Sequence, residues 1–391
     1  VTAMEKAEQI KVLKQLMAHI NAGTNVDAGG IRHTPAETYT SPARARQEWD
    51  SFFRGHPQII GMSGDLPEPG SFTTHDDFDL PILATRDQSG RFRAFANVCR
   101  HRGAIVETET RGKKKLFSCP FHAWTYAPDG RLVAVPKEDH FGQIDKNCHG
   151  LTELPATEHC GLLWVHPQAD GVLDMDSLMG GLTPEFDSWD FSRMVYLGED
   201  TYETPMNWKL AIDTFGETYH FSALHKNSLF PFFHGNVQAY DTYGRNHRMS
   251  LCTRGIDELR GTDEADWHIT DGAFPVYYMF PNVQVNVGAT TVVLVRVYPH
   301  GDDPHRSYSR ITFYGRPEAL DHDDERLVEL PRQFAEIIRD EDYVAAASSH
   351  RGLRSGLLDH MVFGRNEPAL HHYHNTYREA LGLAPLPLME A

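Results

Sequence analysis

The sequence predicts an α+β protein: a small all-β domain precedes a larger domain in which an antiparallel sheet grips a long C-terminal helix. Three observations lead to this prediction. Residues 57–167 consist of short, partly alternating segments cut by Gly, Pro and Asp, and such closely spaced turns are typical of small β domains. Residues 283–297 are strongly β-branched, which predicts strands. Residues 327–349 resemble a long helix, and a sheet packed against it fits this order.

We expect three segments along the chain. Residues 1–45 form an N-terminal helical segment that packs on the larger domain, because apolar residues recur with a roughly helical period between Glu5 and Asn21 and a glycine follows. Residues 46–168 form the small β domain and residues 169–391 the larger one, with the junction at the polar, turn-like residues 168–171. In the larger domain we also predict a helix over residues 207–224 and a strand over residues 308–314.

Composition and missing motifs exclude several functional classes. The chain has 391 residues and a formal charge of −17, which disfavours nucleic acid as a partner. It has no run of 18 apolar residues and a charged, amphipathic N-terminus, so we expect a cytoplasmic protein without a membrane partner. It lacks a phosphate-binding loop and a dinucleotide fingerprint, so it gives no sign of binding a nucleotide or flavin itself. Its 23 histidines direct attention to metals.

The sharpest motif lies in the small β domain. Cys99-Arg100-His101-Arg102-Gly103 is followed, after a hairpin-sized stretch, by Cys119-Pro120-Phe121-His122, and a predicted strand precedes each Cys/His pair. Two thiolates and two imidazoles on two loops can converge on one metal centre, and zinc is the ordinary metal for such a set. The order of the ligands argues against zinc, because common zinc fingers have both cysteines first and both histidines second.

The residues around these pairs resemble those of another centre. C-x-H-R-G followed by C-P-x-H is the pattern of a Rieske [2Fe–2S] site, in which two histidines replace two cysteines on one iron. The resemblance implies that Cys99, His101, Cys119 and His122 hold this cluster. It continues through W-x-Y-x3-G-x-L-x3-P, the pattern of Rieske oxygenases, at Trp124, Tyr126, Gly130, Leu132 and Pro136. Ala123 stands where the family usually has Gly, a change that we expect to cost little.

A second motif lies in the larger domain. Asn207-Trp208-Lys209 precedes Asp213, Glu217, His220 and His225. Two histidines near a carboxylate suit a non-haem iron with open positions for O₂. Residues five apart lie about 140° apart on an ideal helix, so these rings converge only if the helix bends or ends. Rieske ring-hydroxylating oxygenases carry N-W-K and then [DE]-x2-H-x4-H, and this resemblance implies that His220 and His225 ligate the mononuclear iron.

The third iron ligand is expected from the C-terminal helix. The family carries E-D-x7-[QH]-x-G-L-x-S there, which fits residues 341–355 and implies that Asp342 is the ligand. Asp340 is the first alternative and Glu341 the second. The nearby cluster of His371, His372 and His374 has no counterpart in the family and is predicted to lie at the surface or at an interface.

Two other acidic residues are catalytic candidates. Glu217 stands at the family position between the two metal sites, where Asp is usual and Glu occurs in members that act on quaternary amines. The resemblance implies that it links the iron site to the cluster ligand His122 of a neighbouring subunit. Asp213 stands where naphthalene-type enzymes have Asn. For both carboxylates, a solvated helix surface is the alternative interpretation.

Together the motifs resemble those of the terminal oxygenase component of a multicomponent Rieske enzyme, with a [2Fe–2S] cluster and a mononuclear Fe(II). The resemblance implies electrons from a separate ferredoxin or NAD(P)H reductase, and a homotrimer with or without a small β subunit. We expect dihydroxylation or monohydroxylation of a small aromatic substrate, since residues 229–287 are rich in aromatics. The alternative is a monooxygenase that demethylates a quaternary amine or an N- or O-methyl compound. A Rieske electron carrier and a zinc-stabilised binding module are the other hypotheses.

Overall fold

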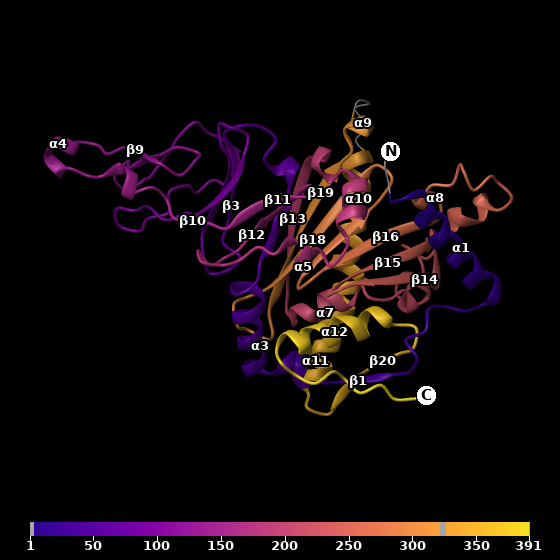
Figure 1. The fold of residues 1–391 in the computed structure, drawn as a ribbon. Coiled ribbons are helices and arrows are strands. Elements are labelled where there is room, and N and C mark those ends of the chain that lie inside the picture. Colours follow the sequence, from indigo (N-terminus) through magenta and orange to yellow (C-terminus); the bar gives the residue numbers. More distant parts are fainter. Residues whose placement is uncertain (1–3, 321–325, 391) are drawn as a thin grey trace. The chain divides into compact units, whose positions relative to one another are not determined.

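The computed structural model describes residues 4–320 and 326–390, and the chain divides into two compact units. The smaller unit consists of Asp50–Met175 with Phe191–Val195. The larger unit consists of Val1–Trp49, Asp176–Asp190 and Tyr196–Ala391. The predicted α+β class, with a mainly β unit and a larger mixed unit, is confirmed (Figure 1). Within the described ranges, none of the helices combines the length and apolar character that a bilayer-spanning segment needs.

Three small antiparallel sheets build the smaller unit, with the strand orders β10-β5-β4-β3-β6, β11-β12-β2 and β7-β8-β9. The strands are β2 (Gln58–Met62), β3 (Ser71–His75), β4 (Ile82–Arg86), β5 (Phe92–Ala96), β6 (Arg111–Lys113), β7 (Phe117–Ser118), β8 (Thr125–Tyr126), β9 (Leu132–Ala134), β10 (Glu153–Leu154), β11 (Ala156–His159) and β12 (Leu162–Val165). Short helical turns connect them: η1 (Trp49–Arg54), η2 (Ser63–Asp65), α4 (Glu138–Phe141), η3 (Lys146–Cys148) and η4 (Phe191–Arg193). The buried core includes Phe72, Phe95 and both motif cysteines.

A seven-stranded antiparallel sheet forms the centre of the larger unit, in the order β13-β19-β18-β17-β16-β15-β14. Its strands are β13 (Val195–Thr204), β14 (Phe233–Tyr243), β15 (Asn246–Thr253), β16 (Ala273–Met279), β17 (Val283–Val287), β18 (Thr291–Pro299) and β19 (Ser307–Gly315). Strands β15 to β18 are buried along almost their whole length, because other elements cover both sheet faces. Burial on both faces explains why residues 283–297 are almost continuously apolar rather than strictly alternating.

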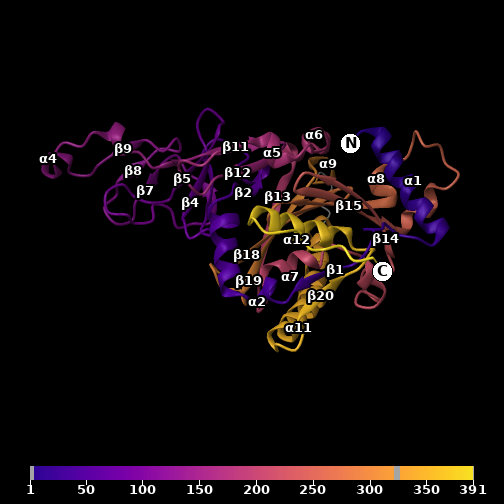
Figure 2. The same ribbon diagram turned by 60° about the horizontal axis from the view of Figure 1, so that its bottom comes forward.

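Helices cover this sheet within the larger unit (Figures 1 and 2). They are α1 (Lys6–Ala22), α2 (Glu37–Thr40), α3 (Pro42–Glu48), α5 (Met175–Met179), α6 (Thr183–Trp189), α7 (Trp208–Asp213), η5 (Tyr219–Ser222), η6 (Arg254–Leu259), α8 (Ile269–Gly272), α9 (Pro317–Leu320), α10 (Arg326–Ile337), η7 (Ile338–Asp342), α11 (Tyr343–Arg354) and α12 (Pro368–Ala380). Strands β1 (Arg32–Pro35) and β20 (His360–Phe363) form a separate pair. Helix α1, which ends at the left-handed Gly23, packs on β14 and α8, and α10 packs on β18 and β19.

Two helix predictions need correction. The helix expected over residues 207–224 ends at Asp213, and the chain returns to a single 3₁₀ turn only at Tyr219–Ser222. The break follows from the polar residues between them, which bond to the local backbone and compete with helix formation. The long C-terminal helix extends from Arg326 to Arg354, but a π-helical turn, η7, interrupts it. Both irregular turns carry predicted iron ligands.

The Asn-Trp-Lys motif has a structural role in this fold. Asn207 caps α7: its side-chain oxygen accepts the backbone N–H of Lys209 at 3.1 Å. The next two side chains converge on one buried carboxylate, because Trp208 Nε1 donates to Glu48 Oε2 at 3.0 Å and Lys209 Nζ donates to the same oxygen at 2.5 Å. Burial lowers the pKa of Lys209, although Glu48 opposes that shift. The motif therefore fixes the start of α7 to the end of α3.

Candidate metal centres and substrate cavity

The two Cys/His loops of the smaller unit have matching backbone geometry. The carbonyl of Cys99 accepts the N–H of Gly103 at 2.9 Å, and that of Cys119 accepts the N–H of Ala123 at 2.9 Å. Each cysteine N–H donates in turn to the carbonyl five residues later, at 2.8 and 2.9 Å. Both loops close through a residue with positive φ, +77° at Gly103 and +56° at Ala123. Two equivalent loops therefore present one thiol and one imidazole each.

The four side chains are arranged as a pair of thiols and a pair of imidazoles. Cys99 and Cys119 are buried and interact with each other, while the rings of His101 and His122 have centroids 4.7 Å apart and lie nearer the surface. Among the described residues, no three of these donors come within 4.8 Å of one another. A single tetrahedral zinc needs all four donors around one ion, whereas a two-iron cluster needs one pair on each iron. The arrangement fits the cluster.

Side chains around the loops explain the rest of the first motif. Trp124 stacks on the ring of His101 at 5.1 Å, with an angle of 10° between the planes. The hydroxyl of Tyr126 accepts the N–H of Arg100 at 3.0 Å and lies 3.4 Å from Cys99 Sγ. Gly130 has a φ of +82°, and a Cβ there would meet the ring of Phe95 at 2.4 Å, so only glycine fits. These residues hold the loops in shape.

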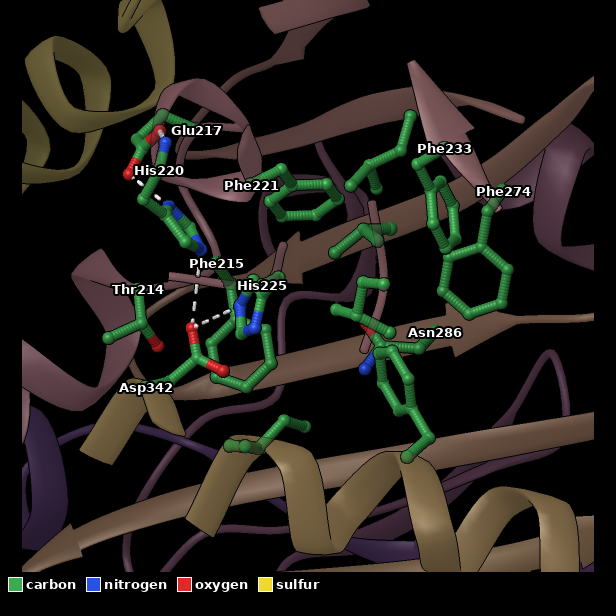
Figure 3. A pocket seen from close by; sticks show the side chains of 15 residues that line it. Thr214, Phe215, Glu217, His220, Phe221, His225, Phe233, Phe274, Asn286 and Asp342 are labelled. Atoms are coloured by element: carbon green, nitrogen blue, oxygen red, sulfur yellow. Dashed lines mark hydrogen bonds and ion pairs between the residues drawn. The ribbon is translucent and has the colours of Figure 1, made fainter. Parts of the chain in front are cut away.

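In the larger unit, His220, His225 and Asp342 come together as one group whose potential ligand atoms lie within 4.8 Å of one another. Asp342 Oδ1 lies 3.3 Å from His220 Nε2 and 3.2 Å from His225 Nε2 (Figure 3). His220 Nε2 is buried and makes no hydrogen bond of acceptable geometry. Two imidazoles and one carboxylate, with an unsatisfied ring nitrogen at their centre, fit a metal ion that is held on one side and open on the other.

The two irregular turns create this convergence. His220 lies in the 3₁₀ turn η5, and the chain has left that turn before His225, so the helix ends between the two predicted ligands as their spacing requires. Asp342 is the last residue of the π turn η7, and π turns inside helices are frequent at functional sites. The following residue, Tyr343, is buried and bonds through its hydroxyl to Ser309 on β19 at 2.7 Å, which anchors the turn to the sheet.

A carboxylate holds the outer nitrogen of each imidazole. Glu217 Oε1 bonds to His220 Nδ1, and Glu217 Oε2 accepts the backbone N–H groups of Tyr219 and His220. Glu341 Oε2 bonds to His225 Nδ1 at 2.8 Å and accepts the hydroxyl of Ser228 at 2.8 Å. Such outer carboxylates fix the tautomer and direction of ligating histidines. The sequence pattern indicated Glu341 only as a second alternative ligand and did not reveal this orienting position.

The charges of the group are mutually dependent. Burial alone would lower the pKa of His220, but the carboxylates of Asp342 and Glu217 outweigh it and raise that pKa to about 10. The pKa of His225 is raised against burial in the same way, by Asp342 and Glu341. Burial raises the pKa of Asp342, yet its ion pairs with both histidines lower it overall. Without a metal, protons on the imidazoles balance the carboxylates, so a cation is expected to replace those protons.

A cavity partly open to solvent lies against this group, with about 470 Å³ of empty space when the solvent at its mouth is included. It is bounded by strands β14 to β17, by the turns that carry the histidines, and by α10 and η7. Its lining residues are Thr214, Phe215, Glu217, His220, Phe221, His225, Leu229, Phe233, Leu251, Phe274, Val276, Asn286, Phe334, Ile338 and Asp342. Apart from the two histidines, Asp342 and Glu217, the lining is almost wholly apolar. The cavity can therefore hold a small, largely apolar molecule beside the metal position.

Other predicted residues lie elsewhere. Asp213, the last residue of α7, is buried and bonds to the Tyr39 hydroxyl at 2.7 Å and to His374 Nε2 at 2.9 Å. Asp340 is exposed and pairs with Arg339 at 2.6 Å. The prediction of a surface or interface position was wrong for His371 and His374, which are buried because α12 packs into the unit through that face.

Comparison with protein families follows the same division. Residues 56–154 match the model of the Rieske [2Fe-2S] domain, and residues 191–383 match that of the ring hydroxylating alpha subunit catalytic domain. The chain belongs to the Rieske oxygenase large-subunit family. It is accordingly an oxidoreductase of the class that uses O₂, with a [2Fe–2S] domain and a catalytic domain of the mononuclear iron type.

Similar proteins include both a monooxygenase and a dioxygenase subunit. The carnitine monooxygenase oxygenase subunit of Acinetobacter baumannii is 26% identical over 82% of this chain and 85% of its own. The anthranilate 1,2-dioxygenase large subunit of Acinetobacter baylyi is 25% identical over 70% of this chain and 59% of its own. A crystal structure of the quaternary ammonium Rieske monooxygenase CntA has the same fold, with a TM-score of 0.75, 22% identity and coverage of 90% and 95%.

The left-handed Ala123 gives the first prediction. An alanine with positive φ is strained by about 1–2 kcal/mol, more than the small cost that the sequence suggested. Glycine avoids this strain, and the extra chain entropy that glycine loses on folding costs less than the strain that it removes. Ala123→Gly should therefore stabilise the Rieske unit by about 1 kcal/mol, measured by denaturant unfolding followed through the visible circular dichroism of the cluster. Gly103→Ala, the equivalent position in the other loop, should destabilise by a similar amount. Equal or lower stability of Ala123→Gly would contradict the backbone assignment.

The outer carboxylate Glu341 gives the second prediction. Glu341→Ala removes the group that orients His225, so Fe(II) should bind the mononuclear site about 10–100-fold more weakly. The measurement is Fe(II) titration of protein from which the mononuclear iron has been chelated, with the Rieske absorption as a check on folding. Asp340→Ala is the matched control, because this neighbour is exposed and paired only with Arg339. Equal Fe(II) affinity in both variants would rule out the orienting role.

Proposed function

We propose that this chain is the terminal oxygenase of a multicomponent enzyme that oxidises a small quaternary amine, with electrons from a separate NAD(P)H reductase, directly or through a ferredoxin. Support comes from one juxtaposition: a cavity walled by phenylalanines lies directly against a group of two histidines and one carboxylate. Monooxygenation inserts one oxygen atom of O₂ into a C–H bond and releases the other as water, using two electrons and two protons. When the hydroxylated carbon is bonded to the quaternary nitrogen, its C–N bond breaks, and the products are a tertiary amine, an aldehyde and one proton.

In this proposal each metal-binding residue has a defined task. Cys99 and Cys119 hold one iron of the Rieske cluster, and His101 and His122 hold the other. His220, His225 and Asp342 hold the mononuclear iron. The cluster supplies single electrons and the mononuclear iron supplies the site for O₂. Glu217 and Glu341 keep the two ligating imidazoles in the required tautomer and direction.

The cavity walls favour a cationic or apolar guest over an anionic one. Five phenylalanines line the cavity: Phe215, Phe221, Phe233, Phe274 and Phe334. Aromatic faces bind trimethylammonium groups through cation–π attraction. Among the described side chains that line the cavity none is Lys or Arg, so a cation would meet no like charge beyond the metal itself. These walls are compatible with the first expectation, an aromatic substrate, but the comparisons favour the amine: the carnitine monooxygenase matches more of both chains than the anthranilate dioxygenase does.

Assembly and electron transfer are a further part of the proposal. We infer a head-to-tail homotrimer in which Glu217, through the remaining lone pair of its Oε1 atom, also accepts a hydrogen bond from His122 of the neighbouring subunit. Both carboxylate oxygens of Glu217 already receive bonds within their own turn, so the side chain is held firmly in place. A fixed carboxylate beside a ligating histidine suits the transfer of an electron between subunits.

A substrate comparison tests the proposed function. The purified protein with a surrogate reductase should convert choline, and should convert carnitine more slowly because carnitine carries a carboxylate. It should convert poorly 3,3-dimethyl-1-butanol, which has the shape of choline without its charge. Product must be measured directly, because uncoupled turnover consumes NADH and forms peroxide. Toluene and benzoate serve as aromatic comparisons. Product from these arenes, with none from the trimethylammonium compounds, would restore the aromatic function and reject the amine.

A further inference from the structure

One buried polar side chain in the cavity wall is unexplained by the iron site. Asn286 lies on β17 and is 1% exposed, and neither its amide nitrogen nor its amide oxygen has a hydrogen-bond partner. Asn286 is paired with Val276 on the adjacent strand β16. Both residues line the cavity, so Asn286 faces inward. Figure 3 shows the side chain on the Phe233 and Phe274 side of the cavity, across from Asp342.

An unsatisfied buried amide is costly, because it has lost its water without gaining a partner. Gln284, two residues earlier on the same face of β17, has a partner for its amide nitrogen, which donates to the hydroxyl of Tyr373 at 2.9 Å, and lacks one only for its amide oxygen. Asn286 instead ends in the cavity, where only its contents can satisfy it. Buried groups left without a partner in a folded protein are commonly satisfied by a ligand or ordered water.

The remaining cavity wall narrows the chemistry of that partner. The hydroxyl of Thr214 already donates to the carbonyl of Ala211 at 2.8 Å. The charged residues that line the cavity are Glu217 and the members of the group at the metal position. Asn286 is therefore the uncharged polar group available at the far end. An amide offers one acceptor and two donor positions, which suits a hydroxyl or a carbonyl. A carboxylate would bring a full charge into an apolar wall where no described lining residue is cationic.

We propose that Asn286 is a specificity residue that binds an uncharged hydroxyl or carbonyl group of the substrate and so sets which carbon faces the iron position. The inference rests on the proposed function only in one respect: the proposed function supplies the trimethylammonium group, at the end of the substrate that Asn286 does not bind. The substrate class is then a quaternary amine with a neutral hydrogen-bonding group a few bonds from the nitrogen. The same amide would select hydroxyl-bearing arenes if the substrate were aromatic.

The test measures binding without turnover, by calorimetry on the anaerobic, iron-loaded enzyme. The probes are choline and ethyltrimethylammonium, which differ by one hydroxyl, with glycine betaine as the carboxylate analogue. Wild type should bind choline about five- to tenfold more tightly than ethyltrimethylammonium, the size of one neutral hydrogen bond. Glycine betaine should bind more weakly than choline. Asn286→Leu, with the same number of side-chain heavy atoms and the same branching, should bind choline only as well as ethyltrimethylammonium.

Two controls separate substrate binding from a structural role. Asn286→Leu removes an unsatisfied amide, so the Tm of the protein should stay equal or rise, whereas loss of a structural hydrogen bond would lower it. Val276→Ala, on the neighbouring strand, should weaken both probes in the same proportion. A lowered Tm for Asn286→Leu, or an unchanged preference for choline, would overturn the inference.

A second probe pair distinguishes this inference from the proposed function. Benzyl alcohol and toluene also differ by one hydroxyl but carry no charge. If neither trimethylammonium compound binds while Asn286→Leu abolishes a preference for benzyl alcohol, the amine function fails and the role of Asn286 stands. If hydroxyl-bearing and hydroxyl-free members of both pairs bind wild type equally, the role of Asn286 fails. That role also fails if no hydroxyl-bearing probe binds at all.

Discussion

One carboxylate oxygen, Asp342 Oδ1, lies between the Nε2 atoms of His220 and His225. The turns and outer carboxylates around the site hold these three side chains together. Asp342 is 5% exposed, so its charge has little water and depends on these two rings. Each ring depends in turn on an outer carboxylate, Glu217 or Glu341. Three acids and two histidines thus form one coupled set, which is unfavourable unless positive charge is held at its centre.

The backbone around this set is irregular because regular helices would not direct these side chains toward one another. A regular helix through residues 207–224 would point the two imidazoles in different directions, and a regular helix through residue 342 would change the direction of the carboxylate. Stable surroundings hold the irregular turns: Asn207, Trp208 and Lys209 fix α7 to α3, and Tyr343 fixes the π turn to β19. Buried polar contacts of this kind are worthwhile when they position a functional group, since an apolar core would be at least as stable.

The metal-binding motifs could be predicted from sequence because ligand spacing is local and chemically restrictive. The Cys/His pairs, the two histidines and the acidic helix position were all recognisable from short patterns, and the structure brings His220, His225 and Asp342 together as expected. What failed depends on tertiary packing. The burial of Asp213 and His374 follows from their bonds to Tyr39, a residue more than 170 positions away from either of them along the chain. The orienting role of Glu341 could not be predicted, since the sequence shows it only as one acid in an acidic run, and Asn286 carried no sequence signal as an amide in a strand.

One chain holds both a two-iron cluster and a separate mononuclear iron, and the metal content of the protein tests this claim most directly. The measurement is the determination of iron, zinc and acid-labile sulfide in wild type and in Asp342→Ala. Wild type should contain about three irons and two sulfides per chain, and the variant about two irons and two sulfides with an unchanged Rieske absorption spectrum. Zinc without sulfide in wild type, or undiminished iron in Asp342→Ala, would contradict the claim.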